Sequence, residues 1–169
     1  RNLTVKFIKR EAEQSVDVMV DGEKFTSYWW PDSVMKPILY PVFSPGGAEI
    51  TRGFPIKSRP GERTDHPHQV GMWLNYGDVN GIDFWGNSYA IPDEIRKVRE
   101  GRIKHLGISQ LSSGTGEGTM VTAESWIGPS GKELLAENTT YHCIANGSMR
   151  IVQRLTTLTA TAGGITEKD

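Results

Sequence analysis

The segment from Glu62 to His68 concentrates side chains that can move protons. It places His66 and His68 on either side of Pro67, with the carboxyl groups of Glu62 and Asp65 close by in the chain. Proline biases the preceding residue toward extended backbone, in which residues two apart point to the same side. We therefore expect the two imidazoles to project together. Because the ordinary pKa of histidine lies near neutral pH, one imidazole can act as general acid while the other, or a carboxylate, acts as general base. The predicted catalytic residues are His66, His68, Glu62 and Asp65.

Aromatic and polar side chains that suit a sugar lie on both sides of this segment. Trp73 and Trp85 offer flat faces that can pack against the apolar C–H face of a pyranose. Arg52, Arg63 and Asp83 offer hydrogen-bonding groups for its hydroxyls. We therefore predict a carbohydrate, or a similar small molecule, as the ligand, and these five residues as its binding set. A non-catalytic carbohydrate-binding or interaction module would use the same surface.

Two other interpretations of the histidine pair stay open. Histidines spaced as H-x-H can bind a divalent metal such as iron, manganese or zinc. Glu62, Asp65, His105 or His142 could complete such a set, although the sequence identifies no third ligand. Alternatively, the segment is a structural loop in which Asp65 accepts backbone N–H bonds and the histidines satisfy buried carbonyls. We expect no cofactor unless the metal interpretation holds.

The elements that must position these residues are strands. Alternating and β-branched runs are separated by glycine-rich and proline-rich turns about every ten residues, which is typical of a β-sandwich, with a barrel as the alternative. Asp21-Gly22 predicts a two-residue hairpin, because glycine supplies the positive φ that this turn requires. A short helix is predicted only over 92–100, and the last four strands should form an antiparallel meander. The predicted strands are 3–8, 15–20, 23–30, 37–43, 48–52, 70–76, 102–111, 120–127, 132–144 and 149–160.

Composition narrows the classes of function. The chain has 169 residues, which suits one domain over 1–169, and 19 Lys plus Arg against 20 Asp plus Glu, so we expect no nucleic-acid partner. No run approaches the roughly 18 apolar residues that a membrane span needs. Cys143 is the single cysteine, which excludes an internal disulfide framework and a cysteine zinc cluster. The stretch 53–88 has little regular pattern, and long loops of this kind are often functional.

The block from Lys36 to Trp85 also carries a family resemblance, in Lys36-Pro37-Ile38-Leu39-Tyr40-Pro41-Val42, Thr51-Arg52-Gly53-Phe54-Pro55, 61–68, 71–73 and 77–85. It resembles the bacterial domain-of-unknown-function family labelled methane oxygenase PmoA. The membrane subunit of that name needs transmembrane helices, whereas this sequence has none. What the resemblance implies is a soluble β-sandwich protein that is exported to the periplasm or outside the cell, in bacteria that degrade polysaccharides. Family members are longer, about 300 residues, so we expect this chain to be the front part of such a domain.

Overall fold

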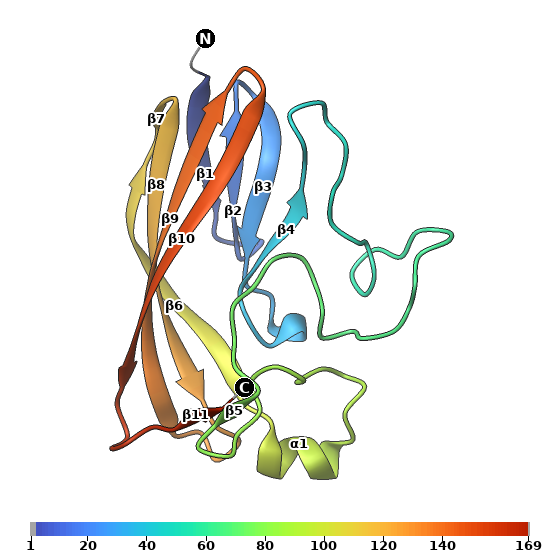
Figure 1. The fold of residues 1–169 in the computed structure, drawn as a ribbon, viewed down its shortest axis with the longest axis vertical. Coiled ribbons are helices and arrows are strands. Elements are labelled where there is room, and N and C mark those ends of the chain that lie inside the picture. The colour runs from blue at the N-terminus through green and yellow to red at the C-terminus, as the bar shows by residue number, and fades with distance from the viewer. Residues whose placement is uncertain (1–2, 169) are drawn as a thin grey trace.

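The computed structural model describes residues 3–168 and consists mainly of antiparallel strands (Figure 1). Its helical elements are the 3-10 turn η1 (Asp32–Val34) and the helix α1 (Asp93–Arg99), which lies within the predicted helix 92–100. Within the described residues, no helix is long and apolar enough to cross a membrane. The strands are β1 (Thr4–Arg10), β2 (Ser15–Val20), β3 (Glu23–Trp29), β4 (Ile38–Val42), β5 (Asp78–Val79), β6 (Arg102–Ser112), β7 (Gly114–Thr115), β8 (Glu117–Ile127), β9 (Glu133–Asn146), β10 (Met149–Ala160) and β11 (Glu167–Lys168).

Two sheets pack face to face and confirm the predicted all-β sandwich. One sheet has the order β4-β3-β2-β1-β7, and the other has the order β10-β9-β8-β6, while β11 and β5 form a small separate pair. Strands β6, β8, β9 and β10 are the predicted meander, and their lower half extends beyond the first sheet in Figure 1. The hairpin between β2 and β3 is also confirmed, since Asp21 (φ 47°) and Gly22 (φ 84°) both have the positive φ of a two-residue turn.

The expected strand over 70–76 is wrong. It is reduced to an isolated bridge between Leu39 and Met72, and Gly71 has a φ of 61° that takes the backbone out of an extended path. The alternation of apolar and polar residues over 70–76, which suggested a strand, has another cause. Asn75 is buried because its side-chain amide donates to the carbonyl of Phe84 (2.8 Å), so it holds two loop segments together rather than facing a neighbouring strand.

Three hydrophobic clusters hold the molecule together. The largest lies between the two sheets and includes Val16, Val18 and Tyr28 from the first sheet and Met120 and Tyr141 from the second. Alternate residues of each strand fill this layer, as expected for strands with one buried face.

The second cluster covers the lower half of the meander. Here Val79 and Phe84, from the loop region after β4, pack against Trp126 of β8. The third cluster joins the loop region to the first sheet, because Val70 packs on Ile38 and Tyr40 of β4, with Trp29, Val34, Ile56 and Trp73 at its margin. The irregular segment is therefore fixed to the sandwich by apolar contacts at two places.

A hydrogen-bonded polar network crosses the main core. Tyr28 donates to Glu124 (2.7 Å) and its hydroxyl lies 2.8 Å from His105 Nδ1, while Arg154 pairs with Glu137 (3.0 Å). Glu124 and Glu137 are register partners on β8 and β9, and both are buried. Burial, followed by the neighbouring Glu137 carboxyl group, raises the pKa of Glu124 to about 8, and burial lowers the pKa of His105 to about 4. Both side chains are therefore mainly uncharged at neutral pH.

Candidate functional site

A single arginine organises the loop that carries the two histidines. The guanidinium of Arg52 donates through Nη1 to the carbonyl oxygens of Arg63 (3.3 Å) and Asp65 (2.9 Å), and through Nη2 to those of His66 (3.0 Å) and Gln69 (2.9 Å). These bonds engage both terminal nitrogens of the group. Arg52, expected from sequence to bind substrate, here holds the backbone of residues 63–69 in place.

Glu62 is a second anchor of the same loop. Its carboxylate accepts hydrogen bonds from the backbone N–H groups of Gly53 (2.8 Å) and Phe54 (3.0 Å) and from Arg59 Nε (2.6 Å). The bond from Gly53 makes the largest contribution to lowering the pKa of Glu62 to about 2, against the opposing effect of partial burial. A carboxylate that is held ionised and bonded in this way serves the loop rather than proton transfer.

The His66-Pro67-His68 segment is a turn, so the extended backbone expected at His66 is wrong. His66 has a φ of 51°, and its carbonyl accepts from the N–H of Gln69 (2.9 Å) as well as from Arg52. Left-handed backbone at a residue other than glycine persists only where surrounding contacts fix it, and these two bonds do so. The two imidazoles are nevertheless neighbours, with ring centroids 5.6 Å apart.

His66 is oriented by the carboxylate beside it. Its Nδ1 lies 3.0 Å from Oδ2 of Asp65, which Arg63 also contacts (2.6 Å), and the imidazole is exposed. Partial desolvation raises the pKa of Asp65, but the bond from His66 and the charge of Arg63 outweigh it, so the net pKa of this carboxyl group is lowered. With Nδ1 donating to Asp65, Nε2 is the ring nitrogen of His66 that remains for a ligand.

A buried lysine that the sequence reasoning missed lies beneath His68. Lys36 is only 4% exposed; its ammonium donates to the carbonyl of His68 (2.5 Å) and lies 4.8 Å from the ring centroid of Trp73. Within the described part of the chain, it forms no ion pair with a carboxylate. Burial lowers the pKa of Lys36 to about 8, although the charge of Asp83 acts against this shift. Burial and then the charge of Lys36 lower the pKa of His68, so its imidazole is neutral at pH 7.

Two tryptophans lie next to the two imidazoles. Trp73 and Trp85 meet edge to face with centroids 5.8 Å apart, and Trp85 lies 6.5 Å from His68. Trp85 is 42% exposed, and Asp83 fixes the turn that presents it by accepting from the backbone N–H groups of residues 85 (2.7 Å) and 86 (3.0 Å). Asp83 thus supports an aromatic residue through its Oδ1. We call the following four residues the ring cluster: His66, His68, Trp73 and Trp85.

The other two histidines do not join this cluster. His105 lies in the sandwich core against Trp30, at 4.0 Å between ring centroids, and His142 on β9 pairs with Glu117 (3.0 Å). Across residues 3–168, no group of three or more His, Cys, Asp or Glu side chains is placed to hold a metal ion. His105 and His142 therefore have other partners in this fold, and the metal interpretation of the histidine pair stays a prediction.

Comparison with known proteins identifies a family. A family model described as a family of unknown function, DUF6807, matches residues 15–169. Neither a curated protein nor a solved structure matches the chain. The methane oxygenase label implied by the resemblance stays a prediction. The match spans most of the chain and includes Lys36, the Arg52 loop and the whole ring cluster, and the chain therefore belongs to this family of unknown function.

Proposed function

We propose that the chain binds a carbohydrate at the ring cluster. The observation that carries this proposal is the display of Trp85, a large exposed indole, beside Trp73 and two imidazoles. An exposed aromatic side chain held by a capped turn is available for a partner, and indole faces pack well against the C–H face of a sugar ring. Imidazole nitrogens next to it can bond to hydroxyl groups. The exported location implied by the resemblance is part of this proposal, since polysaccharides lie outside the cell.

We further propose that His66 transfers protons on the bound sugar, an activity favoured by its pairing with Asp65. In this proposal, Nε2 of His66 takes the proton of the anomeric hydroxyl while a water molecule gives a proton to the ring oxygen, so that the bond between C1 and the ring oxygen breaks and the ring opens to the aldehyde. The proton on His66 then returns to the hydroxide that the water leaves. Closure on the other face then yields the other anomer. Arg52 and Glu62 are positioning residues here, because they hold the loop and their polar groups are engaged by it.

Binding is tested with the variant Trp85→Ala. Tryptophan fluorescence and calorimetry are recorded against a panel of neutral mono- and oligosaccharides. Loss of the indole removes the main apolar contact, which corresponds to at least about tenfold weaker binding. The matched control is Leu155→Ala on β10, a side chain that is 71% exposed and not part of the ring cluster. Equal affinity of Trp85→Ala and the control would contradict the proposal.

Proton transfer is tested separately by polarimetry of freshly dissolved α-anomers of the sugars that bind. His66→Gln should retain sugar affinity but lose the acceleration of mutarotation, and Asp65→Asn should reduce it. If the unaltered chain binds sugar without accelerating mutarotation, the site is that of a binding module, which is the non-catalytic alternative.

A further inference from the structure

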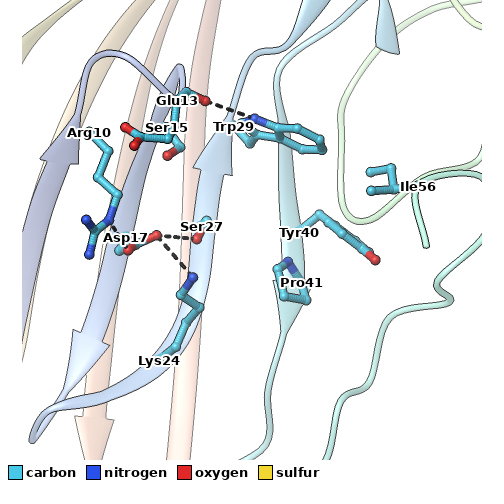
Figure 2. Close-up of a pocket in the computed structure, with 10 residues that line it drawn as sticks. All are labelled: Arg10, Glu13, Ser15, Asp17, Lys24, Ser27, Trp29, Tyr40, Pro41 and Ile56. Carbon is cyan, nitrogen blue, oxygen red and sulfur yellow. Dashed lines mark hydrogen bonds and ion pairs between the residues drawn. The ribbon is translucent and has the colours of Figure 1, made fainter. Parts of the chain in front are cut away.

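The outer face of the first sheet carries a hollow that the ring cluster does not use (Figure 2). Its volume is about 410 Å³, which is in the range of small-molecule sites. In Figure 2, charged and hydroxyl groups of β1, β2 and β3 lie on one side, and Trp29, Tyr40, Pro41 and Ile56 lie on the other. We call this the sheet-side hollow.

A second hollow adjoins the first and leads toward the histidine turn. It has a volume of about 350 Å³ and shares Trp29 and Ile56 with the sheet-side hollow. It continues to Pro67, the residue between the two histidines of the ring cluster, and to the exposed ring of Tyr89. Trp29 and Ile56 thus line both hollows, which lie side by side between the sheet and the loop, and we call the two together the groove.

The apolar wall of the sheet-side hollow is a pair of nearly parallel rings. Trp29 and Tyr40 lie 6.4 Å apart at an angle of 28°, and the indole N–H of Trp29 donates to the carbonyl of Glu13 (3.1 Å), which fixes the ring. Tyr40 is only 8% exposed, so the partly exposed indole of Trp29 supplies more of the ring surface on this wall. Such a surface suits the apolar face of a ring-shaped ligand.

The polar wall is built around a buried carboxylate. Asp17 accepts from Ser27 (2.6 Å) and Arg10 (2.7 Å) and lies 3.3 Å from Lys24 Nζ, so both its oxygens are engaged. Arg10 and Lys24 are partly exposed and keep further N–H groups for a ligand. Their two positive charges are balanced by Asp17 and by Glu13, which also lines the hollow. The wall therefore favours an uncharged ligand with oxygen acceptors.

We propose that the ligand is a neutral oligosaccharide whose successive sugar units lie along this groove, with one unit on Trp29 and Tyr40. This inference rests on the proposed carbohydrate function and names the class of sugar: a chain rather than a single ring. The groove lies on the face of a sheet and is lined by side chains, whereas an added peptide strand would need a free sheet edge. The polar wall around Asp17 disfavours a lipid tail.

The test is the dependence of affinity on chain length. The probes are the β-1,4-linked series from one to six units of glucose, xylose and mannose, measured by calorimetry. We expect a hexasaccharide to bind at least tenfold more tightly than its monosaccharide. Trp29→Ala should reduce the hexasaccharide affinity toward that of the monosaccharide. Lys24→Ala should weaken hexasaccharide binding severalfold. This variant tests the groove by itself if Trp29→Ala does not fold.

Lys132→Ala, in the exposed turn between β8 and β9, is the matched control and should bind like the unaltered chain. Affinity that does not change with chain length, or that both groove variants leave intact, overturns this inference. If in that case Trp85→Ala still abolishes monosaccharide binding, the ring cluster proposal stands and only the groove fails. If no sugar binds at any length, both are overturned.

Discussion

The buried carboxyl pair in the core makes folding stability depend on pH. Glu124 has its pKa raised from an ordinary value of 4.5 to about 8, by burial and then by Glu137. Between these two values, the folded chain holds a proton that the unfolded chain has released. The free energy of unfolding therefore falls as pH rises, by about 1.4 kcal/mol per pH unit for one proton. This contribution is fully present below pH 4.5 and is lost as pH rises through about 8, a total on the order of 5 kcal/mol.

The perturbation that isolates this effect is Glu124→Gln. Glutamine has nearly the same shape, carries no titrating proton, and keeps an oxygen that can accept from Tyr28. We expect the variant to match the unaltered chain in stability near pH 5 and to exceed it increasingly toward pH 8. His105, whose pKa is lowered to about 4 by burial, adds stability with rising pH over 4–6.5, but it does so in both chains and cancels in the difference.

The assay is urea unfolding followed by tryptophan fluorescence, at half-unit steps between pH 5 and pH 8.5. Glu94→Gln on α1 is the control, because that side chain is exposed and its stability difference from the unaltered chain should change far less with pH. A Glu124→Gln difference that changes as little as that of the control, or that changes in the opposite direction, would refute the reasoning, since it would mean that Glu124 is ionised in the folded chain.

Three further outcomes follow from packing and hydrogen bonding. Arg52→Lys should loosen residues 63–69, because lysine cannot bond to all four carbonyls. Losing two such bonds costs about 2 kcal/mol, so limited trypsin digestion should cut after Arg63 roughly thirtyfold faster. Gly101→Ala would place a Cβ 2.5 Å from the Phe84 ring and should destabilise the fold by about 1–3 kcal/mol in thermal unfolding, whereas Gly107→Ala on β6 meets nothing within 4 Å and should be close to neutral. Cys143 is buried and its pKa is raised to about 12, so mass spectrometry should find it alkylated by iodoacetamide in urea but not in the folded chain. The first account is contradicted if trypsin cuts Arg52→Lys and the unaltered chain at equal rates. The second is contradicted if Gly101→Ala and Gly107→Ala unfold at the same temperature, and the third if iodoacetamide rapidly alkylates Cys143 in the folded chain.

The parts of the fold that were predicted well from the sequence depend on residues that are close together in the chain. The Asp21-Gly22 hairpin and the final meander follow from turn chemistry and period-2 patterns, which act over a few positions. The expected strand 70–76 failed because alternation reports which side chains are buried, not which backbone groups pair. Asn75 is buried by a bond to another loop, and no local pattern contains that contact.

In the candidate site, too, the features set by neighbouring residues were predicted and those set by distant residues were not. The neighbouring positions of His66 and His68 were expected from their spacing, but the left-handed backbone at His66 depends on Arg52, fourteen positions earlier in the chain. Lys36 was missed as a site residue because its burial is created by His68 and Trp73, which the fold brings to it from more than thirty positions away. A lysine before an apolar strand looks like a surface residue until those partners are known.

Strand β10 has a practical consequence for anyone handling this chain. It forms one edge of its sheet, pairs with β9 without a register shift, and contains no proline over twelve residues. Its charged side chains, Arg150 and Arg154, turn inward to partners on other strands and loops. A long, regular and uncharged border of this kind is a template for strand addition. Concentrated stocks should therefore form intermolecular β-structure on storage, and dilute, cold samples should keep longest.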